Sequence, residues 1–170
     1  SGGAGNDTLD GGAGADTMIG GLGNDTLNGG ATTDTLNQEN NNRVSYQNAG
    51  GAVSVDLAAG TASGAAGNDI LINFNQIRGS AYNDTLLGSD STQSERFEGL
   101  AGDDSIDGRG GFDDVAYDRS TSAVNVNLAT GTASDGFGGT DTLSHIEGIR
   151  GSAYHDVLTG GLAANGTSVS

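Results

Sequence analysis

Aspartate recurs at every ninth residue near the start of the chain, and this spacing is the feature most able to do chemistry. Residues 2–37 divide into four nine-residue units, each with aspartate at its sixth position and an apolar residue at its eighth. The aspartates are Asp7, Asp16, Asp25 and Asp34, and glycine fills the first two positions of every unit. Carboxylates and the carbonyl oxygens of glycine-rich turns are ligands that suit Ca²⁺. The spacing therefore indicates a row of calcium sites.

The same unit returns later with more variation. The later units are 64–72, 79–87, 99–107, 108–116, 136–144 and 151–159, and their sixth residues are Asp69, Asp84, Asp104, Asp113, Asp141 and Asp156. Segment 90–98 is in phase with the two units that follow it and carries Glu95 at the sixth position, so we interpret it as a degenerate unit.

Each unit is interpreted as a loop of six residues followed by a strand of three, in which only the eighth side chain points into the core. One unit buries a single apolar residue and cannot fold alone, whereas stacked units bury a ladder of them. Two units with opposed strands make one coil of 18 residues. Loops one coil apart are then stacked about 4.8 Å from each other, which brings Asp7 near Asp25 and Asp16 near Asp34.

A longer repeat lies over the short one. The segment VSVDLAAGTAS (53–63) matches VNVNLATGTAS (124–134) at an offset of 71 residues, and its alternating valines indicate strands that face the core. We predict one continuous solenoid divided into a regular array (1–37), a first module (38–116), a second, truncated module (117–160) and a frayed end or linker (161–170). Because Ser1 begins at the edge of a repeat, we expect the chain to be part of a longer protein.

The composition excludes several classes of protein. The net charge is −16 and there is no lysine, which argues against binding to nucleic acid or to anionic membranes. There is no cysteine, so disulfides and thiolate chemistry are excluded. No run of about 18 apolar residues is long enough to span a bilayer. No nucleophile and base stand at a catalytic spacing, and we predict that the chain is not an enzyme.

Three consecutive units, GGAGNDTLD, GGAGADTMI and GGLGNDTLN, resemble the RTX (repeats-in-toxin), or haemolysin-type, calcium-binding nonapeptide GGxGxDxUx. The resemblance implies an all-β fold, a parallel β-roll or right-handed β-solenoid with several Ca²⁺ ions in its stacked loops. In the family, each ion takes two carbonyls and an Asp from one loop, and two more carbonyls and an Asp from the loop 18 residues on.

Carried over to this chain, that ligand set assigns two sites in the regular array. The first comprises Gly3, Gly5 and Asp7 with Gly20, Leu22 and Asp25, and the second comprises Gly12, Gly14 and Asp16 with Gly29, Ala31 and Asp34. Further ligands implied by the later units are Glu95 with Gly108, Gly110 and Asp113, and also Asp69, Asp84, Asp104, Asp141 and Asp156.

Because metal affinity contributes directly to folding, we expect a chain that is disordered at low Ca²⁺ and folds at about millimolar Ca²⁺, the range of extracellular modules. The resemblance further implies a secreted or cell-surface protein exported by type I secretion. Two other functions are considered: an adhesin or ligand-binding module, for polysaccharide or for ice through Thr8, Thr17, Thr26 and Thr35, and the non-catalytic C-terminal module of a secreted enzyme.

Several features also have a purely structural interpretation. The carboxylates Asp69, Asp84, Asp141 and Asp156 can belong to turns that need no metal. The segment 103–114 mimics an EF-hand loop but lacks its final Glu. His145 and His155 are expected at the surface, Arg78 and Arg150 beside acidic partners, and Tyr82 and Tyr154 at positions that close a coil.

Overall fold

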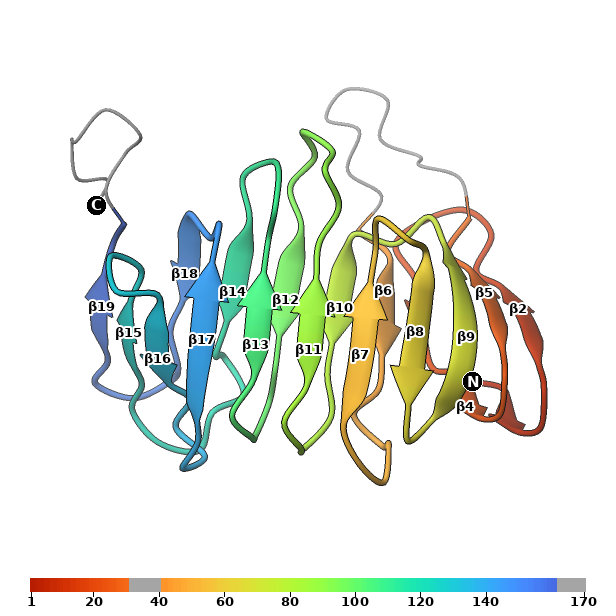
Figure 1. The fold of residues 1–170 in the computed structure, drawn as a ribbon, viewed down its shortest axis with the longest axis horizontal. Coiled ribbons are helices and arrows are strands. Elements are labelled where there is room, and N and C mark those ends of the chain that lie inside the picture. Colours follow the sequence, from red (N-terminus) through yellow and green to blue (C-terminus); the bar gives the residue numbers. More distant parts are fainter. Residues whose placement is uncertain (31–40, 162–170) are drawn as a thin grey trace.

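The computed structural model describes residues 1–30 and 41–161, and it shows an elongated stack of short strands (Figure 1). The described residues form strands and turns without a helix. No helix in this part of the chain is therefore long and apolar enough to cross a membrane. The expected all-β solenoid of mostly parallel strands is confirmed.

Two sheets lie face to face. The first, here called the short sheet, contains in spatial order β3 (Thr17–Met18), β6 (Arg43–Ser45), β10 (Gln76–Arg78), β12 (Arg96–Glu98), β14 (Asp114–Ala116) and β18 (Gly148–Arg150). All of its strands are parallel. It lies behind the other sheet in Figure 1.

The second, here called the long sheet, contains in spatial order β2 (Thr8–Asp10), β5 (Thr26–Asn28), β9 (Gly67–Ile72), β8 (Thr61–Gly64), β7 (Val53–Asp56), β11 (Thr85–Leu87), β13 (Ser105–Asp107), β17 (Thr140–Ser144), β16 (Thr132–Ser134), β15 (Asn125–Asn127) and β19 (Val157–Thr159). A separate parallel pair joins β1 (Gly3–Ala4) to β4 (Gly21–Leu22) at the N-terminal end.

The strand register places equivalent apolar residues directly above one another. Leu9 pairs with Leu27 and Leu27 with Leu71 in the long sheet. In the short sheet Val44 pairs with Ile77, which pairs with Phe97. Except for Leu9, which is partly buried, these residues are buried. The eighth position of the unit therefore builds the core, as the pattern predicts.

The long sheet contains two antiparallel strands that the pattern does not predict. Strand β8 runs antiparallel to β7 and β9, and β16 runs antiparallel to β15 and β17. Each repeated spacer thus folds into a three-stranded meander that occupies one sheet only. The alternating valines do face the core, because Val53, Val55, Val124 and Val126 are buried. The meanders also explain why the long sheet has more strands than the short sheet.

Replacing Phe97 by Ala is expected to destabilise the calcium-saturated protein by about 3–5 kcal/mol, because it leaves a cavity in the core. Phe97 is completely buried, whereas Phe112 is 58% exposed. The matched change F112A should cost no more than about 0.5 kcal/mol. Urea denaturation in saturating Ca²⁺ measures both values, and equal losses would contradict this account of the core.

Candidate metal sites in the stacked loops

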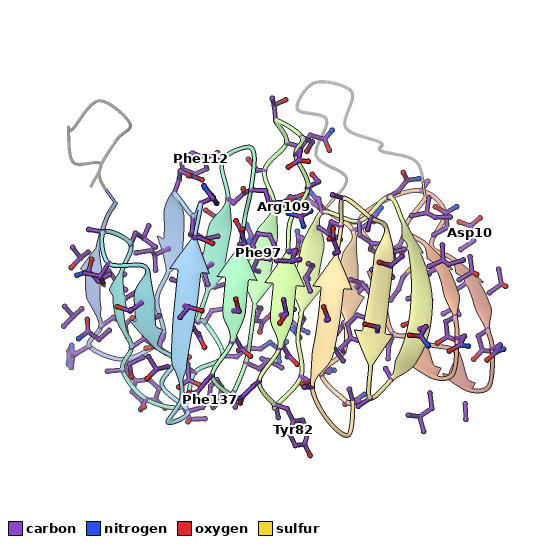
Figure 2. The ribbon with its side chains drawn as sticks, in the orientation of Figure 1. Asp10, Tyr82, Phe97, Arg109, Phe112 and Phe137 are labelled. Atoms are coloured by element: carbon purple, nitrogen blue, oxygen red, sulfur yellow. The ribbon has the colours of Figure 1, made fainter. Side chains whose placement is uncertain are left out.

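The acidic loops lie along the two long edges of the stack. Loops that enter the long sheet form the lower loop edge, which comprises 2–7, 20–25, 64–69, 79–84, 99–104, 135–141 and 151–156. Loops that enter the short sheet form the upper loop edge, which comprises 11–16, 41–42, 73–75, 88–95, 108–113 and 145–147. Figure 2 shows Tyr82 and Phe137 at the lower edge, and Arg109 and Phe112 at the upper edge.

The sixth-position carboxylates are stacked into ladders along these edges. The amide of Asp7 donates to Asp25 Oδ1 at 2.8 Å, and the amide of Asp25 donates to Asp69 Oδ1 at 2.9 Å. Further along the lower edge, the amide of Asp84 donates to Asp104 Oδ1 at 2.8 Å, and the amide of Asp104 to Asp141 Oδ1 at 3.1 Å. One oxygen of each accepting carboxylate is therefore fixed by the backbone of the neighbouring loop.

The upper edge repeats this arrangement with different residues. The amide of Glu95 donates to Asp113 Oδ1 at 2.9 Å, and the amide of Asp113 donates to Glu147 Oε2 at 2.9 Å. The amide of Asp16 donates to Asn42 Oδ1 at 2.8 Å. Both ladders thus use the same contact, a backbone amide to the acidic or amide side chain one layer away.

The structure brings together the residues of the first predicted site. Besides the contact between Asp7 and Asp25, the amide of Gly3 donates to the carbonyl of Gly20 at 3.0 Å, and that of Gly5 to the carbonyl of Leu22 at 2.7 Å. A carbonyl oxygen has two lone pairs, so these hydrogen bonds leave acceptor capacity for a metal ion.

The second predicted site is described only in part. The amide of Asp16 contacts Asn42, because Thr17 and Met18 pair with Arg43 and Val44. Ala31 and Asp34 themselves lie outside the described residues, as does Thr35. Of this site, Gly12, Gly14, Asp16 and Gly29 are described, and the carbonyl of Gly29 accepts from Asn42 Nδ2 at 2.8 Å.

Five sixth-position carboxylates each retain an oxygen without a donor. This oxygen is the Oδ2 atom, which is buried and accepts no hydrogen bond from the described residues. The five residues are Asp7, Asp16, Asp25, Asp104 and Asp113. An anionic oxygen removed from water without a partner is energetically costly. A hard dication such as Ca²⁺ fits this need, because it binds carboxylate and carbonyl oxygens and tolerates flexible geometry.

In two other carboxylates a tyrosine donates to this second oxygen. The hydroxyl of Tyr46 donates to Asp69 Oδ2 at 2.8 Å, and the hydroxyl of Tyr117 donates to Asp141 Oδ2 at 2.8 Å. Both tyrosines are buried. Burial is the main cause and the nearby carboxylate the second cause that raise the pKa of each phenol well above its usual value. They therefore remain neutral donors. These two aspartates have their oxygens satisfied without a metal.

Serine satisfies three more carboxylates. The amides of Ser80 and Ser152 donate to the Oδ2 atoms of Asp84 and Asp156, and their hydroxyls donate to the Oδ1 atoms. Ser89 contacts Glu95 in the same way, with its amide 2.8 Å from Oε2 and its hydroxyl 2.6 Å from Oε1. The structure thus divides the loops into two kinds, which are here called open loops and capped loops.

The second position of the loop distinguishes the two kinds. In open loops it has a positive φ, which is +110° at Gly3 and +116° at Gly21, and also +79° at Leu100 and +62° at Arg109. In the Ser-capped loops the corresponding serine has no positive φ. A φ that is not positive lets the serine amide and hydroxyl turn toward the carboxylate, so this residue supplies the cap in the Ser-capped loops.

In the open loops and the Ser-capped loops, the first glycine is required by close approach rather than by φ. A Cβ placed on Gly20 or Gly99 would collide with Oδ2 of Asp25 or Asp104. The same contact at Gly88 involves Glu95 Oε2, which shows that the loop of the degenerate unit starts at residue 88. This loop is two residues longer than the others, and the longer glutamate side chain reaches across it.

Arginine does not neutralise the open loops. The arginine ion pairs among the described residues are Arg78–Glu98, Arg119–Glu98, Arg109–Asp56, Arg96–Asp114 and Arg150–Asp114. None of these acids occupies the sixth position of a unit. Burial raises the pKa of Asp104 to about 8 and that of Asp113 to about 7, with neighbouring carboxylates adding to both effects. These loops therefore favour either a proton or a metal cation.

Backbone oxygens must supply part of any ligand set. Within residues 1–30 and 41–161, no group of three or more His, Cys, Asp or Glu side chains converges on one point. An ion held here would therefore rely on one or two carboxylates together with turn carbonyls such as those of Gly3, Gly5, Gly20, Leu22, Gly108 and Gly110.

The remaining sequence predictions have mixed outcomes. Arg78 and Arg150 do pair with acids, at 2.6 and 3.4 Å, and His145 lies at the surface beside Asp107. Segment 103–114 contains β13 and enters β14 without flanking helices, so its likeness to an EF-hand loop is confined to the sequence. Tyr82 and Tyr154 do not close the coil with their side chains, which are exposed.

Sequence reasoning missed the capping residues. Tyr46 and Tyr117 stand in the repeated V-x-Y segments, 23 and 24 residues before the aspartates they contact, so only the three-dimensional fold relates them. Ser80, Ser89 and Ser152 share a local signal, the replacement of Gly-Gly by Gly-Ser at the start of the loop. Asn42 has no signal in the nonapeptide pattern.

Stacked parallel strands with carboxylates in their turns define a β-roll built from repeats. The model of the RTX calcium-binding nonapeptide repeat, in four copies, matches residues 1–36, 73–92 and 91–119. The chain therefore contains repeats of the RTX calcium-binding nonapeptide family, which form a calcium-binding repeat module. A comparison with curated proteins found no match. The loops 64–69 and 136–141, which are capped by tyrosine, lie outside the matched residues.

Acidification is expected to increase the β-structure of the calcium-free chain. The pKa values of Asp104, Asp113 and Asp141 are raised in the fold to about 8, 7 and 6 from 3.8, with burial as the main cause. The stability that these three carboxyl groups contribute is complete below their pKa in the unfolded chain, and it is lost as pH rises through their pKa values in the folded chain. Far-UV circular dichroism without metal should therefore show more strand at about pH 5 than at about pH 8. The reverse order would contradict this assignment.

Proposed function

We propose that the chain is a structural module of an exported protein that folds when it binds Ca²⁺ outside the cell. The observation that supports this most is the set of buried carboxylate oxygens without donors in the open loops. In the absence of cations these charges oppose the stack, and in millimolar Ca²⁺ they become ligands that stabilise it. The match of these loops to the RTX calcium-binding repeat supports the choice of metal.

Within this proposal, the first ion is held by Asp7 and Asp25 with the carbonyls of Gly3, Gly5, Gly20 and Leu22. Bound calcium would neutralise the two carboxylates and tie one loop to the next. Asp16, Asp104 and Asp113 serve further ions. The capped loops stack without metal, because their carboxylates accept hydrogen bonds from Tyr or Ser.

The low calcium of the cytosol would leave the chain unfolded before export, and the higher calcium outside would fold it. The proposal is tested by titrating the metal-free chain with Ca²⁺ and following far-UV circular dichroism, with Mg²⁺ as the control. A cooperative gain of β-structure at about millimolar Ca²⁺, and little gain with Mg²⁺, is the expected result. A chain that is already folded in excess chelator would overturn the proposal.

The pair Asp25→Asn and Asp69→Asn separates open from capped loops. Each change removes one charge and retains the Oδ1 acceptor of the ladder. D25N should raise the calcium concentration at the folding midpoint several-fold, because a ligand is lost. D69N should leave the number of bound ions unchanged and cost about 1–2 kcal/mol through the hydrogen bond from Tyr46. Isothermal titration calorimetry and urea denaturation measure the two effects, and identical behaviour of the two variants would contradict the distinction.

A further inference from the structure

The turn between β16 and β17 carries a buried carboxylate that belongs to no nonapeptide position. In the first meander the equivalent turn is tight, because Gly64 pairs with Gly67 across Ala65 and Ala66. In the second meander Ser134 pairs with Thr140, where the first pairs Ser63 with Asn68, so the second turn is one residue longer. The longer turn begins with Asp135, and the first meander has glycine at that place.

Asp135 is fully buried. Its Oδ1 atom accepts the amides of Phe137, Gly138 and Gly139 at 2.8, 2.9 and 2.8 Å, and its own carbonyl accepts the hydroxyl of Ser120. Its Oδ2 atom is buried and accepts no hydrogen bond from the described residues. The Oδ1 atom therefore stabilises the turn through three amides, and the Oδ2 atom is available to bind a cation.

The free oxygen lies close to the loop of the neighbouring layer. A Cβ built on Gly139 would come within 2.9 Å of Asp135 Oδ2 and would collide with the carbonyl oxygen of Gly102. Gly139 has no side chain, so these two oxygens line the same narrow space. Gly102 belongs to the open loop 99–104, whose Asp104 is buried and has an Oδ2 atom without a donor.

No positive side chain neutralises this region. The ion pairs among the described residues include neither Asp104, Asp135 nor Asp141. The turn that carries Asp135 lies directly against the loop of Asp104, because the amide of Thr140 donates to Asp103 Oδ1 at 2.8 Å and the amide of Asp104 donates to Asp141 Oδ1 at 3.1 Å. The second oxygen of Asp141 is occupied by Tyr117. The nonapeptide aspartate of this layer is therefore capped, and Asp135 brings an uncapped carboxylate to the same place.

We propose that Asp135 is a ligand of the Ca²⁺ ion assigned above to Asp104, which it binds together with the carbonyl of Gly102 at the second meander. Asp135 lies outside the nonapeptide pattern, because the hairpin turn here supplies the second carboxylate that position six supplies elsewhere. The donors are two carboxylate oxygens and a carbonyl, which suit a hard dication whose remaining ligands are further carbonyls or water. The proposal rests on the calcium-binding function proposed above, and it adds a ligand that the first meander lacks, because Gly64 stands at the place of Asp135 there.

The test counts bound Ca²⁺ per chain by equilibrium dialysis at saturating calcium, in the wild type and in Asp135→Asn. Asparagine retains Oδ1 for the three amides and replaces only the free oxygen. The control is Asp118→Asn, which removes the same charge from an exposed side chain. D135N should bind one ion fewer than the wild type, and D118N should bind the wild-type number.

Different results separate this inference from the proposed function. If the wild type binds no Ca²⁺, the proposed function itself fails. If the wild type binds Ca²⁺ and D135N binds the same number with the same affinity, only the role of Asp135 as a ligand is overturned. If D135N does not reach the wild-type circular dichroism in saturating calcium, the same count on Asp135→Ser, whose hydroxyl can still accept an amide, decides between one ion lost and none.

Discussion

The whole fold depends on how the stack neutralises the carboxylate that each loop turns inward. Layers about 4.8 Å apart bring acidic side chains together in ladders, and burial removes them from the water that would otherwise stabilise the charge. The hydrogen bond from the neighbouring amide satisfies only one oxygen. A partner for the second oxygen must come from Tyr, from Ser, from a proton or from a metal ion.

Other features of the unit follow from this constraint. In the open loops the first position is glycine because a Cβ there would collide with the carboxylate, as at Gly20 and Gly99. The second position is a residue with positive φ when the loop is open, and serine in three of the capped loops. The eighth position is apolar because each layer adds one side chain to the core. A residue that breaks one of these rules changes how its own loop is neutralised.

Much of this could be predicted from the sequence, since the nine-residue period sets the strands, the core and the 18-residue stacking that joins Asp7 to Asp25. The rest depends on contacts that the period does not encode. Residues 17–18 pair with residues 43–44, which brings Asn42 to the amide of Asp16. Strands β8 and β16 reverse direction in meanders, which brings Tyr46 and Tyr117 to distant carboxylates.

The central claim is that metal ions occupy open loops and not capped ones, and anomalous diffraction from crystals grown in Ca²⁺ tests it most directly. The account predicts anomalous peaks beside Asp25, Asp104 and Asp113, with none at the carboxylates of Asp69, Asp84 and Asp156. Peaks beside the capped carboxylates, or an ordered stack without any peak at the open loops, would contradict it.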